Sequence, residues 1–197
     1  MHIILRDRRE IFTLSGREVT LSKNDETISR IDTHGHIIYY NQTFSKISGY
    51  TKQELLRTPY SILQHSDMPK AVFYFIWQTL LAGNSTHAII KNLTKEGNYY
   101  WELIEFSAQK DNKNSTISFL AKGKQVPKEA IIEIEPLYNR LLDNEKKYNL
   151  SSSIKYLLAF LNSNNRATYN DYICDISREK RSSLLSSLKF QIDNYRN

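Results

Sequence analysis

Alternation of polar and apolar positions predicts a β-hairpin in the first third of the chain. Residues 27–32 (TISRID) alternate with a period of two, and residues 36–40 (HIIYY) follow a turn at Gly35. Strands show this alternation because successive side chains point to opposite faces of a sheet. Three more strands, each bounded by turn residues, are expected over residues 85–94, 99–109 and 115–123.

Two short helices are expected directly after this hairpin. Asn41 can cap the first of them, and Gly49 can end it in the left-handed conformation that glycine adopts readily. Thr51 and Glu54 have the spacing of a capping box, which indicates that a second helix begins there.

Apolar residues spaced by three and four predict a longer helix between the two groups of strands. We expect it to begin at Asp67, which can cap it, and to end at Gly83. From residue 127 the pattern is helical again, and Pro136 should kink or split that helix.

The order of these elements predicts an α+β fold with helices on one face of a five-stranded antiparallel sheet. A helical C-terminal extension follows, in which a polar linker over residues 144–153 precedes amphipathic helices near residues 154–161 and 184–195. We expect an N-terminal cap segment, a central domain, a connecting helix and the extension. These four segments span residues 1–24, 25–125, 126–148 and 149–197.

Charge and composition narrow the classes of partner. The formal net charge is +6, from 27 basic and 21 acidic residues, and most basic residues are interleaved with acids. This interleaving favours a mixed solvated surface, with nucleic-acid binding through Arg178, Lys180 and Arg181 as the weaker alternative. No apolar run approaches the ~20 residues of a membrane span, so we expect a soluble, cytoplasmic chain that reaches the inner membrane only through a partner. Cys174 is the single cysteine and excludes an internal disulfide.

Several short motifs resemble a known family of sensory domains. Residues 35–44 (GHIIYYNQTF) and 47–55 (ISGYTKQEL) resemble PAS domains in general. Other segments resemble the PAS domain of Aer-type aerotaxis and energy-taxis receptors, which sense redox state. These segments are HSDMPKAVF at 65–73, WQTL at 77–80, IKN at 90–92, GNYYW at 97–101 and EPLY at 135–138. The resemblance covers roughly residues 27–142 and implies a PAS fold.

The resemblance also implies a flavin, FAD, bound between the helices and the sheet. The matching positions are His65, Asp67, Trp77 and Asn92. A flavin ring needs flat neighbours and a few fixed donors and acceptors; Trp77 could stack on it, and Asn92 offers both a donor and an acceptor. Redox changes of the flavin would then alter contacts with a signalling partner. The soluble PAS protein of a bipartite energy-taxis system, working with a separate membrane chemoreceptor, is the expected arrangement.

Each of these four residues also has a structural explanation. Trp77 can simply pack in the core, Asp67 can cap the helix, and His65 can bond nearby backbone. Asn92 is the most informative of them because asparagine is depleted in strand interiors. The family pattern has arginine before the histidine and proline after it, whereas this chain has Gln64 and Ser66. An arginine there would supply a fixed charge for a cofactor phosphate.

Other functions compete with a flavin sensor. A haem sensor could use His65 or His87 as an iron ligand, since neutral imidazole commonly binds iron. A cofactor-free PAS module that only dimerises or docks a signalling protein is a further alternative. No phosphate-binding glycine run, nucleophile elbow or kinase motif set is present, so we do not expect an enzyme.

Overall fold

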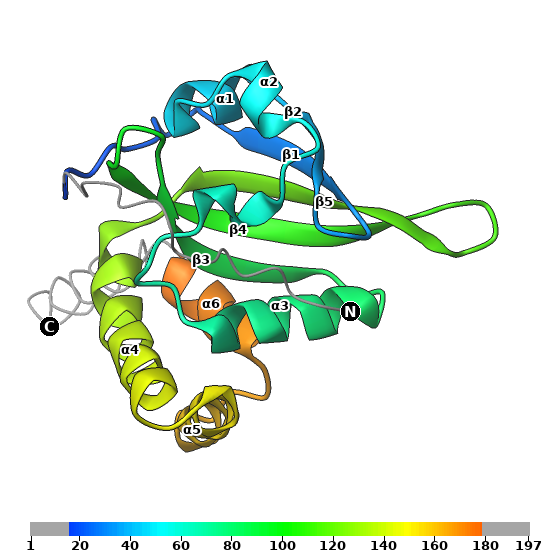
Figure 1. The fold of residues 1–197 in the computed structure, drawn as a ribbon. Coiled ribbons are helices and arrows are strands. Elements are labelled where there is room, and N and C mark those ends of the chain that lie inside the picture. Colours follow the sequence, from blue (N-terminus) through cyan, green and yellow to red (C-terminus); the bar gives the residue numbers. More distant parts are fainter. Residues whose placement is uncertain (1–15, 179–197) are drawn as a thin grey trace, which may run out of the picture.

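The chain folds around one antiparallel sheet whose strand order is β2-β1-β5-β4-β3 (Figure 1). The computed structural model describes residues 16–178. The strands are β1 (Thr27–Asp32), β2 (Ile37–Tyr40), β3 (Thr86–Leu93), β4 (Tyr99–Lys110) and β5 (Thr116–Gln125). The predicted strands and the α+β fold class are therefore confirmed. The first and last strands of the sequence pattern meet in the centre of the sheet, where β1 pairs with β5.

Short helices connect β2 to the long helix that precedes β3. They are α1 (Gln42–Ser48), α2 (Lys52–Leu55) and the 3-10 helix η1 (Tyr60–Leu63), followed by α3 (Lys70–Leu81). The Asn41 side chain accepts a hydrogen bond from the backbone N–H of Phe44, and Gly49 ends α1 with φ of 75°. Both predicted caps are confirmed.

The predicted start of the long helix at Asp67 is wrong. Helix α3 begins at Lys70, after Pro69 in extended conformation. The Glu145 carboxylate accepts hydrogen bonds from the backbone N–H groups of Lys70 and Ala71, at 3.0 and 2.9 Å. A side chain distant in sequence thus binds the free amides that a local cap would have bound.

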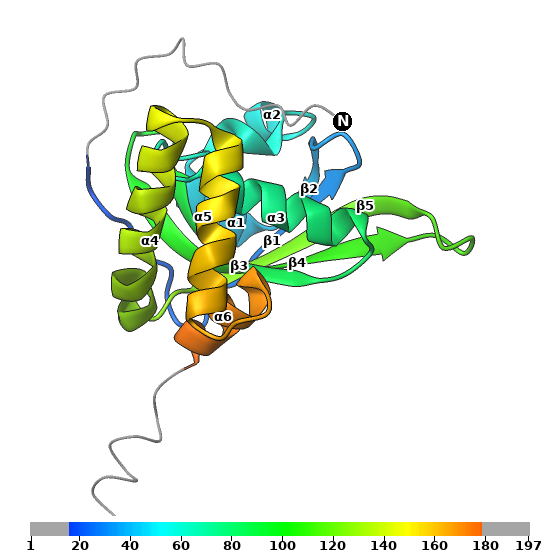
Figure 2. The same cartoon turned by 90° about the horizontal axis from the view of Figure 1, so that it is seen from below.

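The C-terminal helices lie beside β3 and β4 on one face of the sheet. They are α4 (Lys128–Lys147), α5 (Leu150–Ser163) and α6 (Tyr169–Ser177), and they lie together on one side of the molecule (Figure 2). Helix α4 continues through Pro136, so the predicted split does not occur. The predicted linker at residues 144–153 is also wrong, because only two residues separate α4 from α5. Helix α6 was not predicted, and the helix expected near residues 184–195 lies outside the described residues.

The alternation of each strand separates an outer from an inner face. Ile89, Trp101 and Leu103 point to the outer face, where the Tyr138 hydroxyl of α4 donates a hydrogen bond to the Ile89 carbonyl at 2.7 Å. Trp101 and Tyr138 also pack with ring centroids 6.4 Å apart. The inner face instead meets α1, α2, η1 and part of α3. The outer face is covered only over β3 and part of β4, because Glu105, Lys122 and Lys124 on that face are exposed.

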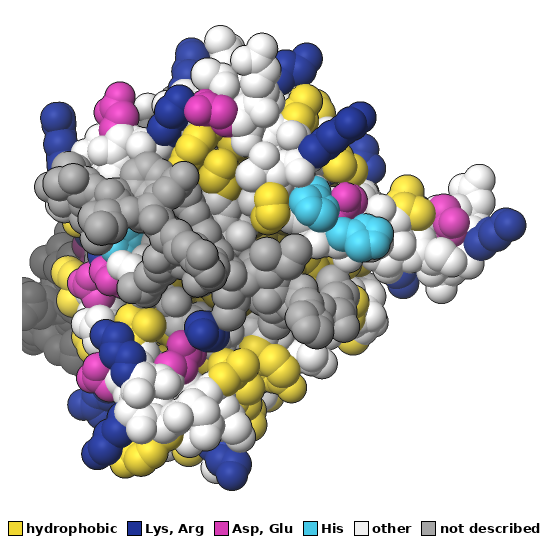
Figure 3. Space-filling model, in the orientation of Figure 1, with side chains coloured by type: hydrophobic (Ala, Val, Ile, Leu, Met, Phe, Trp, Pro, Cys, Tyr) yellow, Lys and Arg dark blue, Asp and Glu magenta, His cyan; other side chains and the backbone are white. Residues whose placement is uncertain are grey.

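Charged residues of both signs are interspersed on the surface shown in Figure 3. Within residues 16–178, no helix is both long and apolar enough to cross a membrane.

Candidate functional site

A polar cluster lies on the inner face of the sheet, with contributions from β1, β3 and β4. The Asn92 side-chain amide donates a hydrogen bond to Oε2 of Glu102 at 2.8 Å. The Thr27 hydroxyl donates to the other carboxylate oxygen, Oε1, at 2.6 Å. Glu102 is fully buried, and Asn92 and Thr27 are 2% and 3% exposed. We call these three residues the Glu102 cluster.

The Glu102 carboxyl is buried without a balancing cation. Burial raises its pKa to about 7, and the hydrogen bonds from Thr27 and Asn92 only partly oppose this rise. Neither a lysine nor an arginine among the described residues contributes to this balance. A carboxyl that is both buried and poised near neutrality is a frequent feature of functional sites.

Tyr100 lies beside this cluster with an unpaired hydroxyl. Its side chain is fully buried, and its oxygen has no hydrogen-bond partner among the described residues. Burial raises the pKa of the Tyr100 phenol, and the nearby Glu102 carboxylate raises it further. Buried polar atoms are nearly always paired, so an unpaired one at a candidate site points to a bound group.

Gly123 on β5 provides the space that the carboxyl occupies. A Cβ atom at this position would lie 2.6 Å from Oε1 of Glu102 and 2.5 Å from the Thr27 hydroxyl. Both distances are far below van der Waals contact, so any larger residue at this position would displace the Glu102 cluster.

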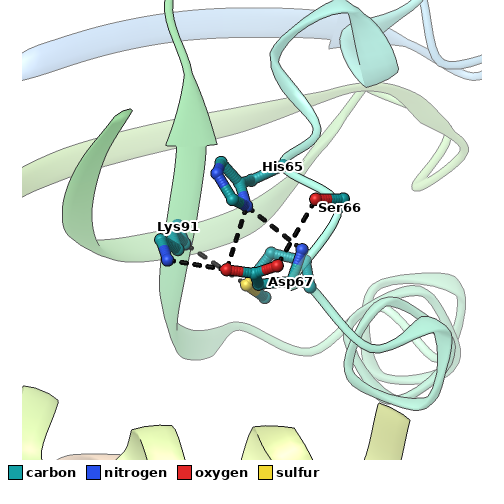
Figure 4. A network of polar contacts seen from close by, with 5 residues as sticks. His65, Ser66, Asp67 and Lys91 are labelled. Carbon is teal, nitrogen blue, oxygen red and sulfur yellow. Dashed lines mark hydrogen bonds and ion pairs between the residues drawn. The ribbon is translucent and has the colours of Figure 1, made fainter. Parts of the chain in front are cut away.

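The predicted residues His65 and Asp67 form a different cluster (Figure 4). Oδ2 of Asp67 pairs with Nζ of Lys91 at 2.8 Å and lies 3.5 Å from Nδ1 of His65. The Lys91 ammonium also lies over the rings of Tyr99 and Trp101, at 4.4 and 5.6 Å from their centroids. We call His65, Asp67 and Lys91 the Asp67 cluster.

Charges in the Asp67 cluster compensate one another. Partial burial alone would raise the pKa of Asp67, but the hydrogen bond from Lys91 and the charges of His65 and Lys91 outweigh it, so that this pKa is lowered. Burial lowers the pKa of His65, and the attraction of Asp67 does not fully offset that effect. The His65 ring is therefore favoured in its neutral form.

The two clusters lie on opposite sides of β3. Lys91 and Asn92 are neighbours in this strand, so their side chains point to opposite faces. Lys91 shares the outer face with Trp101, and Asn92 shares the inner face with Tyr100 and Glu102. The structure thus separates His65 and Asp67 from Asn92, although the sequence resemblance grouped them.

Trp77 lies on the inner face, at a distance from the Glu102 cluster. Its ring packs edge-on against Phe119 of β5, with centroids 5.2 Å apart. Phe119 and Gly123 are four residues apart, which is roughly 13 Å along a strand. Trp77 is half-buried and packs against the core, and only a long ligand could reach both it and Asn92.

Sequence reasoning missed the residues that surround Asn92. Glu102, Tyr100, Thr27 and Gly123 were not identified as candidates. The alternation in β4 contained a signal, because Tyr100, Glu102, Ile104 and Phe106 share one face. A glutamate among these apolar residues on a core-facing strand is unusual and marks a buried polar site.

Known proteins with similar sequences identify the fold family of this region. Residues 37–121 match the family described as the PAS fold. The aerotaxis receptor of Escherichia coli (strain K12) is 35% identical over 122 residues, which is 61% of this chain. The chain carries a PAS domain of the aerotaxis-receptor type. The family recognised from the sequence motifs is therefore confirmed.

Other known proteins are similar to parts of this chain. The nitrogen fixation regulatory protein of Klebsiella oxytoca is 26% identical over 99 residues, half of this chain. The light-state structure of the blue-light photoreceptor Aureochrome1 LOV has a TM-score of 0.49 and 19% identity, over 61% of this chain and 91% of that chain. A PAS domain from Colwellia psychrerythraea has a TM-score of 0.48 and 17% identity, over 52% of this chain and 87% of that chain. The chain spans only 24% of the aerotaxis receptor and 20% of the regulatory protein.

Proposed function

We propose that this PAS domain binds a flavin, FAD, at the Glu102 cluster and reports the redox state of the flavin to a signalling partner. The observation that carries the proposal is a buried, hydrogen-bonding cluster on the inner face of a PAS domain similar to the aerotaxis receptor. Binding sites for planar cofactors are largely apolar with a few fixed polar groups, and this face has that composition.

The residues present fit the pyrimidine edge of a flavin. Asn92 and Glu102 supply buried acceptors, and Tyr100 supplies a hydroxyl with no partner. Trp77 and Phe119 supply aromatic surface farther along the same face. When bound, a flavin would exchange electrons with the electron-transport chain of the cell and change the charge at this edge.

The Glu102 cluster could transmit that change to the sheet. Thr27 belongs to β1 and Asn92 to β3, so the two donors to Glu102 lie on strands separated by β4 and β5. A change in charge beside Glu102 would alter these two hydrogen bonds together. A two-state shift of the sheet and its flanking helices could then reach the partner.

We propose that the partner is a membrane receptor of the chemotaxis type and that the domain acts in the cytoplasm. The similarity to a protein named aerotaxis receptor supports this assignment. A homodimer formed through the PAS domain would be compatible with it.

Geometry makes haem the weaker candidate. Nδ1 of His65 accepts a hydrogen bond from the backbone N–H of Asp67 at 3.1 Å. A neutral imidazole that accepts at Nδ1 carries its proton on Nε2 and has no lone pair there for iron. His87 lies under α6, with its ring nitrogen 3.1 Å from the Asn170 side-chain oxygen.

An absorption spectrum of the purified chain tests the proposal directly. We expect the visible bands of oxidised flavin, their bleaching by dithionite, and release of FAD on acid denaturation.

Asn92→Ala should reduce flavin content by roughly tenfold, as expected for loss of a buried hydrogen bond to a charged group. The matched control is Asn112→Ala in the exposed turn between β4 and β5, which should keep full flavin content. A Soret band would indicate haem, and a colourless chain that does not bind added FAD would indicate an interaction module.

A further inference from the structure

Two polar groups on β4 have hydrogen-bonding capacity that the fold does not use. An ionised carboxylate offers about four lone-pair sites, and the described part of the chain supplies Glu102 with two side-chain donors, Thr27 and Asn92. The Tyr100 hydroxyl has no hydrogen-bond partner within residues 16–178. The two residues are separated by one position in the strand, so both side chains point to the inner face.

We propose that Glu102 and Tyr100 together recognise an amide-type N–H group next to a carbonyl group on the edge of a planar heterocycle. Glu102 accepts from the ring N–H, and the Tyr100 hydroxyl donates to the adjacent ring carbonyl. This inference rests on the proposed function, because the flavin pyrimidine ring carries such an edge. It assigns the recognition to residues that the sequence resemblance did not include.

The cluster around Glu102 selects this chemistry over an anionic ligand. The described residues place no cation beside the carboxyl, so a second negative charge at the same place would be repelled in a medium of low polarity. A ligand N–H instead adds a donor to a carboxylate that still has unused lone-pair sites. Glu102 thus rejects carboxylate and phosphate groups and accepts neutral N–H donors.

Asn92 becomes a positioning residue in this arrangement. One N–H of its amide is bound to Oε2 of Glu102, which fixes the plane of the carboxylate. Thr27 holds the other oxygen, and Gly123 leaves the space for it. The carboxylate is therefore held in place before any ligand arrives, which lowers the entropy cost of binding.

Titration with riboflavin and with N3-methylated riboflavin tests the assignment, using quenching of flavin fluorescence by the full chain. The methyl group removes the N–H donor and leaves the adjacent carbonyls. We expect methylation to weaken binding to the unaltered chain by roughly 10- to 100-fold, the effect of losing a hydrogen bond to a charged group. In Glu102→Ala, which removes the acceptor and creates space for the methyl group, the two ligands should bind within about threefold of each other. Glu102→Gln keeps the side-chain volume and should show reduced discrimination if the alanine variant does not fold.

Tyr100→Phe separates ligand recognition from stability. Because the hydroxyl has no partner, its removal should leave the urea midpoint of the ligand-free chain unchanged or raised. It should nevertheless weaken riboflavin binding by roughly fivefold or more. A tyrosine with a purely structural role would show the opposite result.

The outcomes distinguish the two proposals. If riboflavin and FAD do not bind at all, the proposed function fails and this inference fails with it. Two results would overturn the inference alone: the unaltered chain binds both riboflavins equally, or Glu102→Ala discriminates between them as strongly as the unaltered chain does. Either result would leave a flavin site in which other residues recognise the ligand.

Discussion

Two carboxylates, one on each side of β3, lie in opposite electrostatic environments. Asp67 is half-exposed and pairs with the Lys91 ammonium at 2.8 Å, and its pKa is lowered. Glu102 is fully buried, receives two neutral donors, and has its pKa raised to about 7. Only the thickness of one strand separates the two clusters.

This difference indicates different roles for the two clusters. The charges of the Asp67 cluster neutralise one another, and the ion pair between Asp67 and Lys91 holds the loop before α3 against the edge of the sheet. The Glu102 cluster contains an uncompensated charge, which costs folding free energy. Functional sites commonly contain buried charges that destabilise the fold in this way, so the Glu102 cluster is the better candidate for ligand binding.

The pH dependence of stability should show this contrast most strongly at Glu102. Its pKa is raised from 4.5 to about 7, so the folded chain holds this proton more tightly than the unfolded chain does. Stability therefore falls as pH rises through this range, by up to about 3 kcal/mol. Glu102→Gln should remove this fall and be more stable than the unaltered chain above pH 7.

Urea unfolding of the ligand-free proteins at acidic and alkaline pH measures this effect. Glu105→Gln, at an exposed position of the same strand, is the control for removing one carboxylate. If the stability difference between Glu102→Gln and the unaltered chain were the same at both pH values, Glu102 would not be a buried, uncompensated acid.

Gly123→Ala tests whether the Glu102 cluster depends on the space beside it. The added Cβ would lie 2.5 Å from the Thr27 hydroxyl and 2.6 Å from Glu102. We expect a loss of about 1–3 kcal/mol of stability, typical of overpacking, together with reduced flavin content. Adding Glu102→Ala should restore part of the stability, because it removes one of the two clashes. A Gly123→Ala protein with unchanged stability and flavin content would contradict the geometry of the cluster.

The sequence predicted those features of the fold that depend on neighbouring residues. Strand alternation and the caps at Asn41 and Gly49 are local, and both were confirmed. The start of α3 was misplaced because Asp67 binds Lys91, while Glu145 from a distant helix binds the free amides. These contacts depend on tertiary packing, which periodicity does not report.

The candidate site was predicted only in part, for the same reason. Asn92 was recognised because asparagine is unusual in a strand interior. Its partner Glu102 was overlooked, although the same argument applies to a glutamate on a core-facing position. The grouping of Asn92 with His65 and Asp67 came from family motifs, which do not show on which side of β3 each side chain lies.

Tyr138→Phe tests whether the outer face contributes only to stability. The Tyr138 hydroxyl donates to the Ile89 carbonyl and pairs with the Tyr169 hydroxyl. Its removal should cost about 1–2 kcal/mol, because it removes two hydrogen bonds with a net contribution of roughly 0.5–1.5 kcal/mol each. Flavin content should not change, because these groups lie on the other side of the sheet from Glu102. Tyr148→Phe, at a residue that is 60% exposed, is the matched control. Loss of flavin in Tyr138→Phe would show that the outer face also shapes the site.

Asp67→Asn should have the smallest effect, with a pH dependence opposite to that of Glu102. The lowered pKa of Asp67 means that its carboxylate stabilises the folded chain above its usual pKa of 3.8 and loses this contribution as pH falls. Because Asp67 is half-exposed, solvent screening should limit the loss in Asp67→Asn at neutral pH to about 0.5–1 kcal/mol. Urea midpoints at neutral and strongly acidic pH measure it, with Asp111→Asn in the exposed β4–β5 turn as a control for charge removal. A substitution whose cost grew on acidification would show that Asp67, like Glu102, is an uncompensated acid, and the contrast between the two sides of β3 would be lost.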